Sequence, residues 1–317
     1  MEFGDKSGLA PEARTASHTG RDPPSTPTPM NEQAFIEALR LLPAHPAARG
    51  LADDCAVIEI GSETLVLTHD MLVEGTHYLP EADIADVAWK LVATNLSDLA
   101  AKGAEPLGVL IGHMLGRDDE RFIVGLNEVL AHYQVPLLGG DTVAGTGTRT
   151  HGLTAIGRAT CTPVPARSGA QPGDVLWLVG KVGAAMLGFE ALRDGTGADH
   201  SAYSRPLALL KEGQALAPLA HAMMDVSDGL LLDAFRMAEA SEVTLAIDGA
   251  QVPVAAPERR LACLTWGDDY ALLAALPHGT QPPCNAARIG TVEPRGFAPL
   301  FVDGEPVLNA AGLGYSH

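Results

Sequence analysis

The chain has 317 residues, 46% of them hydrophobic, so it is long enough for two ordinary domains with filled cores. Its 39 acidic residues outnumber the 21 basic ones, and the net charge of −18 argues against a nucleic-acid binder and against adhesion to anionic membranes. The sequence shows no membrane-spanning run and no signal-peptide pattern, and its four cysteines form no CxxC pair, so we expect a cytoplasmic protein with reduced thiols.

The first half of the chain mixes predicted helices and strands. Residues 1–29 are rich in Pro, Thr, Ser and Gly and are interpreted as a disordered arm or a non-native addition. Apolar spacing then predicts a helix over 31–42. Further patterns predict strands over 55–60, 63–73, 106–115, 136–142 and 151–160, and helices over 83–103 and 118–134.

The second half begins after a segment rich in Pro, Gly and Ser over 162–174, which is typical of a linker. We therefore place one domain over 30–160 and another over 161–317. Strands are predicted over 175–180, 222–226, 244–254, 268–276, 286–292 and 300–307, with helices over 181–192, 207–217 and after residue 228 and a loop over 193–206. The pattern predicts two domains that each mix helices and strands.

Aspartates recur where predicted elements begin or end. They are Asp53 and Asp54, Asp70, Asp98, Asp141, Asp225 and Asp228. Each alone could cap a helix or form a turn. As a set they suit Mg²⁺, which prefers hard oxygen ligands, and Asp98 lies on a helix face without a basic residue before Lys102. Asp233, one helical turn after Asp228, is expected to lie on the surface.

Backbone donors and one arginine could bind phosphate near these carboxylates. Gly140 and Asp141 lie at the end of a predicted strand, and Ser227 comes just before a helix start, where anions are favoured. Arg167 is a candidate phosphate ligand or a solvated linker residue, and His77 could contact an anion or be structural. The chain has no GxxxxGK[ST], GxGxxG or GxSxG motif, so a P-loop is excluded.

Seven motifs occur in a recognisable order: ADDCAVIEI, THDMLVEGTHYLP, NLSDLAAKGAEP, LLGGDT, RSGAQPGD, MDVSDGLLLD and GDDYALL. Together they resemble the thiamine-monophosphate kinases, which belong to the aminoimidazole ribonucleotide synthase-like superfamily. The resemblance covers about residues 50–317. It implies a two-domain fold of the α/β and α+β classes, with an N-terminal α/β domain that dimerises through its strands and a C-terminal α+β domain. ATP is expected to lie between the two domains.

The resemblance also implies an activity: ATP phosphorylates thiamine phosphate to thiamine diphosphate by direct in-line transfer. The residues that it assigns to several Mg²⁺ ions are Asp54, Thr68, His69, Asp70, Asp98, Asp141, Asp225 and Asp228. Those that it assigns to ATP are Gly140, Asp141, Arg167 and Ser227. Those that it assigns to thiamine phosphate are His77, Asp268 and Tyr315.

The sequence departs from the pattern of this family at three places. His69 replaces a hydroxyl residue, which is a mild change if the backbone contacts the metal and a larger one if the side chain does. Trp266 replaces a glycine and Asp268 replaces a glutamate, whereas Ala52 replaces a glycine in the motif before Asp54. Alternative hypotheses are another ATP-using enzyme of the superfamily, or a relative that binds nucleotide or divalent cations without catalysis.

Overall fold

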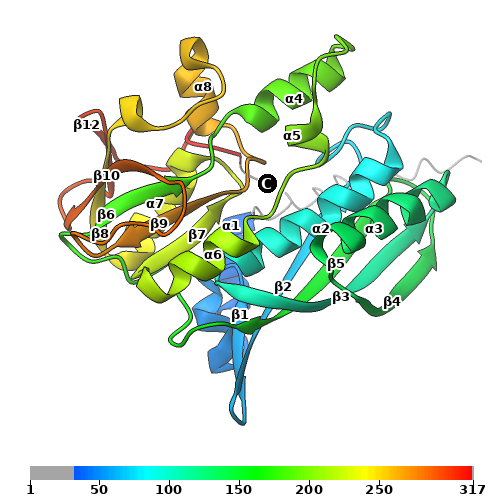
Figure 1. The fold of residues 1–317 in the computed structure, drawn as a ribbon, viewed down its shortest axis with the longest axis horizontal. Coiled ribbons are helices and arrows are strands. Elements are labelled where there is room, and N and C mark those ends of the chain that lie inside the picture. Colours follow the sequence, from blue (N-terminus) through cyan, green and yellow to red (C-terminus); the bar gives the residue numbers. More distant parts are fainter. Residues whose placement is uncertain (1–31, 316–317) are drawn as a thin grey trace, which may run out of the picture.

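The computed structural model describes residues 32–315, so the predicted arm over 1–29 lies outside the described residues. The chain forms two domains, each built on a mixed β-sheet with helices (Figure 1). A helix α1 (Glu32–Leu39) and a 3₁₀ turn η1 (Pro46–Leu51) precede the first strand. Among the described residues, none of the helices combines the length and the apolar character that crossing a bilayer requires.

The N-terminal domain contains a five-stranded sheet in the order β1-β2-β5-β3-β4. Its strands are β1 (Ala56–Ile60), β2 (Glu63–Val73), β3 (Ala104–Leu115), β4 (Leu137–Ala144) and β5 (Thr150–Ala159). Neighbouring strands are antiparallel except β3 and β4, which the helix α3 (Asp119–Tyr133) connects. The strands and helices predicted for this half are confirmed within a few residues.

The helix α2 (Ile84–Ala101) lies between the two domains. Asp83 caps its N-terminus by accepting a hydrogen bond from the Ala85 N–H at 3.0 Å. Nearly every residue of α2 is buried, because it packs on β2, β5 and α3 of its own domain and on three elements of the other domain. A helix that is buried all round can carry side chains to a site between domains.

The C-terminal domain contains a seven-stranded sheet in the order β12-β11-β8-β10-β6-β9-β7, in which only β8 and β11 pair in parallel. Its strands are β6 (Val175–Val179), β7 (Ala222–Val226), β8 (Val243–Ile247), β9 (Ala271–Leu276), β10 (Ala287–Pro294), β11 (Leu300–Val302) and β12 (Glu305–Val307). Its helices are α4 (Ala184–Arg193), α5 (Ser201–Ser204), α6 (Leu210–Leu216), α7 (Leu230–Ser241) and α8 (Arg260–Thr265), with 3₁₀ turns over Ala217–Leu219, Gly249–Gln251 and Pro257–Arg259. The elements of this domain that contact α2 are α5, α6 and β7.

Several predicted boundaries in this domain are wrong. The strand predicted over 244–254 ends at Ile247, because the Asp248 side chain accepts from the Ala250 N–H and starts a 3₁₀ turn. The strand predicted from Asp268 begins only at Ala271, because Asp268 and Tyr270 have φ values of 65° and 51°, which no strand contains. The short helix α5 lies in a predicted loop, and α8 was not predicted.

A buried histidine in the N-terminal core makes stability depend on pH. His151 has no exposed surface and neither ring nitrogen has a hydrogen-bond partner, while its ring stacks on His113 and Phe122. Burial, followed by the nearby His113 and Arg149, lowers the pKa of His151 from 6.5 to about 4. The fold therefore holds the neutral ring, and the stability that this provides is lost as pH falls from 6.5 through 4.

Replacing this residue should remove that pH dependence. Between pH 7 and 4 the wild type should lose roughly 2–3 kcal/mol of unfolding free energy that His151→Phe retains. Denaturant melts at a series of pH values measure the difference, with His278→Phe at an exposed position as control. Parallel pH profiles for wild type and His151→Phe would contradict the assignment.

Candidate active site

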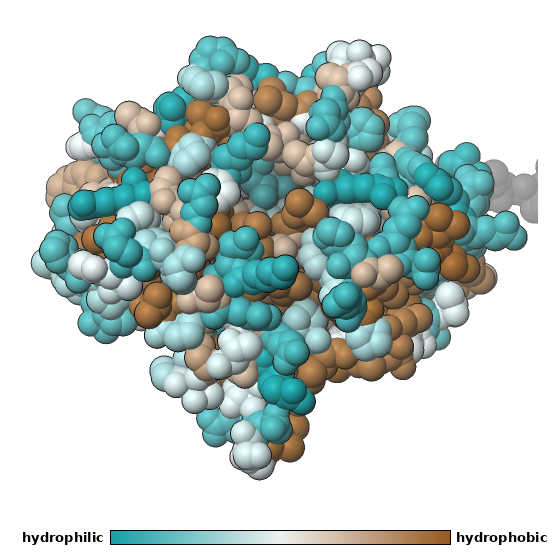
Figure 2. Space-filling model, in the orientation of Figure 1, coloured by the Kyte–Doolittle hydropathy of each residue, from teal (hydrophilic) through white to brown (hydrophobic). Residues whose placement is uncertain are grey.

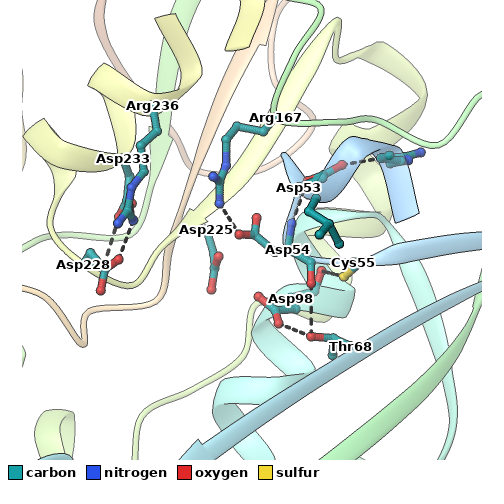
Figure 3. Close-up of polar contacts among 12 residues, drawn as sticks. Asp53, Asp54, Cys55, Thr68, Asp98, Arg167, Asp225, Asp228, Asp233 and Arg236 are labelled. Carbon is teal, nitrogen blue, oxygen red and sulfur yellow. Dashed lines mark hydrogen bonds and ion pairs between the residues drawn. The ribbon is translucent and has the colours of Figure 1, made fainter. Parts of the chain in front are cut away.

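Three aspartates that are far apart in the sequence meet between the two domains (Figure 3). Asp54 precedes β1, Asp98 belongs to α2, and Asp225 belongs to β7. One carboxylate oxygen from each lies within 4.8 Å of the others. The Oδ2 atom of Asp54 is buried and has no hydrogen-bond donor. Grouped carboxylates with an unused oxygen match the ligands that divalent cations such as Mg²⁺ require.

The grouping of these charges shifts their pKa values. Burial, and then the nearby Asp70, Asp225 and Asp54, raise the pKa of Asp98 well above its usual range. Burial and Asp54 raise the pKa of Asp225 to about 8. Holding these carboxylates together therefore lowers the stability of the fold. Such a cost is typical of functional sites and is not expected of residues with a purely structural role. A bound divalent cation would relieve the repulsion.

The strand β2 presents two of the predicted ligands to this cluster. The Thr68 hydroxyl donates to the Asp98 carboxylate, and the Asp70 N–H donates to Asn95 Oδ1 at 3.0 Å. His69 lies between them, and successive side chains of a strand point to opposite faces. The exposed His69 ring contacts Thr154 Oγ1 at 2.9 Å on the other face of the sheet.

The structure therefore narrows the prediction that His69 is a metal ligand, which stays a prediction. Its side chain points away from the carboxylates, so a contact with their metal would have to use the backbone of this residue. Sequence alone left both possibilities open, and the strand geometry decides between them.

Lys102 holds Asp53 and Asp54 in place, and Ser97 connects the two domains at the cluster. Lys102 Nζ lies 2.5 Å from Asp53 Oδ1 and 3.8 Å from Asp54 Oδ2. Burial alone would raise the pKa of Asp53, but Lys102 and Arg49 hold it below its usual range. Across the domain boundary, the Ser97 hydroxyl of α2 donates to Asp225 Oδ2 at 2.6 Å. Neither Arg49 nor Ser97 was predicted from the sequence.

Two guanidinium groups, those of Arg167 and Arg236, pair with aspartates in this region (Figure 3). The half-buried Arg167 pairs with Asp54, so it is not a solvated linker arginine, and its role in binding phosphate stays a prediction. Arg236 of α7 pairs with Asp228 and, at 3.1 Å, with Asp233. Arg236 was missed because its position on a predicted helix carries no motif signal.

The loop between β7 and α7 carries Ser227 and Asp228. Asp233 from the first turn of α7 accepts a hydrogen bond from the Asp228 N–H at 3.1 Å. The prediction that Asp233 is a surface residue is wrong, because its side chain has no exposed area. Burial, followed by Asp228, raises the pKa of Asp233 to about 7. Asp233 therefore fixes the loop that presents Asp228.

Gly140 and Asp141 lie apart from the cluster. They belong to β4, the edge strand that is three positions from β2 in the sheet, a separation of about 14 Å at normal strand spacing. Asp141 is exposed, and its register through Gly112 and Gly152 places it level with Met71, on the face opposite Asp70. The roles predicted for Gly140 and Asp141 stay predictions.

Two of the three residues predicted to bind the second substrate lie next to the loop that carries Ser227 and Asp228. The Asp268 N–H donates to the Ser227 carbonyl at 2.7 Å, and the Tyr315 N–H donates to the Asp228 carbonyl at 2.9 Å. His77 follows β2, and its Nδ1 accepts from the Val73 N–H at 3.0 Å. The predicted substrate residues of the C-terminal domain are therefore hydrogen-bonded to the loop that holds Asp228.

Comparison with known proteins identifies this architecture. Residues 52–159 match the model of the AIR synthase related protein N-terminal domain, and residues 171–298 match that of the C-terminal domain. The thiamine-monophosphate kinase of Escherichia coli strain K12 is 36% identical over 252 residues, which cover 72% of this chain and 76% of the relative. The chain belongs to the thiamine-monophosphate kinase family.

Other thiamine-monophosphate kinases agree with this assignment. The enzyme of Caulobacter vibrioides is 36% identical over 276 residues, covering 80% of this chain and 78% of the relative. The solved structure of AaThiL complexed with AMPPCP and TMP superposes with a TM-score of 0.78 at 27% identity, covering 90% of this chain and 97% of that one. The predicted two-domain fold of this superfamily is thereby confirmed.

Proposed function

We propose that this chain transfers the γ-phosphoryl group of ATP to thiamine phosphate, forming thiamine diphosphate and ADP. The observation that carries the proposal is the carboxylate cluster of Asp54, Asp98 and Asp225 at the domain boundary of a chain of this family. A relative of similar fold binds both AMPPCP and TMP, which fits a site that accepts a nucleotide and a second phosphate compound.

Magnesium fits the residues present at the cluster. Asp54, Asp98 and Asp225 would hold it, with Thr68 and Asp70 close by. When bound, it would neutralise charge on the two phosphates, which otherwise repel by roughly 4 kcal/mol per pair of unit charges at about 4 Å. The Oδ2 atom of Asp54 has no hydrogen-bond donor and only a long ion pair with Lys102, at 3.8 Å, so it can also take a metal ion.

The remaining chemistry needs positioning rather than proton transfer. The second pKa of a phosphate monoester is about 6, so the attacking oxygen of thiamine phosphate is already anionic at neutral pH and needs no general base. When cations bind Asp54 and Asp228, Arg167 and Arg236 are released from these carboxylates and can donate hydrogen bonds to the nucleotide phosphates. The open N-terminus of α7, where Gly229 offers no side-chain cap, adds backbone donors beside Ser227.

The γ-phosphoryl group can be followed directly. Incubation with thiamine phosphate, Mg²⁺ and ATP labelled at the γ-phosphate should place the label in thiamine diphosphate and leave the protein unlabelled. Label that becomes bound to the protein and then moves to the product would contradict direct transfer. Binding of ATP without any turnover would favour an inactive relative, and turnover with a different acceptor would favour another enzyme of the superfamily.

The outer face of the N-terminal sheet fits the predicted homodimer. Large apolar side chains are exposed there, and a hydrophobic patch is visible over β3 and β4 (Figure 2). The exposed large apolar residues on this face are Met71, Leu110, Leu138 and Val143. An apolar sheet face of this kind is normally covered by another surface, and the family resemblance makes a second copy the occupant.

A charge on this face should separate the copies. Leu110 is 38% exposed on β3, and Leu110→Glu is expected to convert a dimer to a monomer without unfolding it. Light scattering coupled to gel filtration measures the mass. Leu261→Glu, at a position that is 69% exposed on α8, is the matched control and should leave the mass unchanged. A wild-type monomer, or a dimer that tolerates Leu110→Glu, would contradict the proposed interface.

A further inference from the structure

Lys90 is a buried cation that the proposed reaction does not use. It lies in α2, and its side chain is 2% exposed. Burying an ammonium group is costly unless it is paired and hydrogen-bonded. Lys90 meets that cost with three contacts: Asp268 Oδ2 at 2.9 Å, the His77 carbonyl at 3.1 Å, and the ring of Tyr203, whose centroid is 3.9 Å from Nζ.

These contacts join the two groups predicted to bind the second substrate. His77 belongs to the N-terminal domain, whereas Asp268 and Tyr203 belong to the C-terminal domain. The Tyr203 hydroxyl also donates to the His77 carbonyl at 3.2 Å, and the Tyr270 hydroxyl donates to Asp268 Oδ1 at 2.9 Å. Both oxygens of the Asp268 carboxylate are therefore held by donors, one of them from the opposite domain.

The backbone around Asp268 needs such support. Asp268 and Tyr270 both have left-handed conformations, with φ of 65° and 51°, and neither is a glycine. Their N–H groups are fixed to the Ser227 carbonyl at 2.7 Å and the Val226 carbonyl at 2.9 Å. Strained conformations of this kind persist where several contacts determine them together, and they are concentrated at ligand-binding sites.

We propose that Lys90 is a positioning residue for the second substrate: it orients the Asp268 carboxylate and the His77 turn relative to each other across the domain boundary. The inference rests on the proposed function. It predicts that Lys90 governs the affinity for thiamine phosphate and leaves the binding of the metal and nucleotide unchanged, because none of its three contacts involves Asp54, Asp98 or Asp225.

A second cation of similar construction provides the control. Arg205 of the C-terminal domain pairs with Asp86 of α2 at 2.5 Å and with Glu128 of α3 at 2.8 Å, and its guanidinium lies 5.3 Å from the Trp89 ring. It therefore also joins the domains through ion pairs and a ring. It touches none of the predicted substrate residues, so its removal reports on domain attachment alone.

The experiment compares Lys90→Met, Lys90→Arg and Arg205→Met with the wild type. Lys90→Met should raise the KM for thiamine phosphate about 10- to 100-fold, while the Kd for AMPPCP with Mg²⁺, measured by calorimetry, stays within about twofold. Lys90→Arg should recover part of the loss, and Arg205→Met should change neither constant. If Lys90→Met fails to fold, the double variant Lys90→Met, Asp268→Asn is measured in its place, because it removes both charges of the ion pair. Its KM for thiamine phosphate should be no higher than that of Asp268→Asn alone.

Several results would overturn the inference. One is an equal effect of Lys90→Met on both ligands, and another is its reproduction by Arg205→Met, since either would leave only domain attachment. An unchanged KM for thiamine phosphate in Lys90→Met, with an active wild type, would overturn this inference but not the proposed function. A wild type without thiamine-phosphate turnover would overturn the proposed function and this inference with it.

Discussion

Asp98→Asn is expected to abolish turnover and, at the same time, to stabilise the magnesium-free protein. The asparagine oxygen can still accept from Thr68, but it carries no charge for a cation, and turnover should fall by about three orders of magnitude or more. The same change removes a buried charge that repels Asp70, Asp225 and Asp54. In EDTA, the unfolding free energy should therefore rise by on the order of 2 kcal/mol.

The prediction is specific because turnover should fall while the unfolding free energy in EDTA should rise. Thermal melts with and without Mg²⁺, together with turnover, measure both effects, and the stabilisation by Mg²⁺ should shrink in the variant. Asp194→Asn removes a fully exposed carboxylate that pairs with Arg193, and it should change neither quantity. A variant of Asp98 that loses stability in EDTA would contradict the view that the cluster is held at a cost to the fold.

Gly213→Ala is expected to destabilise the protein, although alanine normally favours a helix by about 1 kcal/mol. Gly213 belongs to α6, and a Cβ atom there would lie 2.0 Å from the Ala100 carbonyl oxygen of α2. Backbone atoms cannot yield as a flexible side chain can, so α6 would have to move away from α2. We expect a loss of roughly 3 kcal/mol in unfolding free energy from this overpacking.

Denaturant unfolding measures the effect of Gly213→Ala. Turnover should fall as well, because α2 carries Asp98 and the packing of α6 on it helps to set the distance between the domains. Gly296→Ala is the control, since a Cβ atom there meets nothing closer than Thr244 Oγ1 at 3.4 Å. Equal stability of the two variants would show that the contact between α2 and α6 adjusts more easily than its geometry indicates.

The residues of the cluster could be predicted because each follows a local signal. Asp54, Asp98 and Asp225 occur in motifs at the ends of elements or on a helix face without basic partners, and the structure brings all three together. Thr68 and Asp70 follow from the alternation of a strand once one of them is placed. The local sequence pattern can therefore identify candidate ligands that lie on an edge strand or on a buried helix.

The faces of the elements could not be predicted in the same way. His69 and Asp141 were grouped with the other ligands by motif, yet both lie on the outer face of the sheet. Asp233 seemed to belong to a solvated helix, but the loop before α7 folds back over it. Only tertiary packing decides which side of a strand or helix is covered.

The burial of Lys90 could not be predicted from the sequence either. A lysine within a helix is normally a surface residue, and nothing near Lys90 in the sequence indicates that Asp268 will meet it. The partners are separated by most of the chain, and their contact depends on how the two domains dock. An isolated lysine in an otherwise apolar stretch of α2 was the available signal, and it is a weak one.

The release of ADP tests the central claim most directly. Wild-type protein with ATP and Mg²⁺ should release ADP at a rate that depends on added thiamine phosphate, one ADP for each thiamine diphosphate formed. EDTA should stop the reaction. ADP release that ignores thiamine phosphate, or the absence of release while ATP is bound, would contradict the assignment of this site to phosphoryl transfer onto thiamine phosphate.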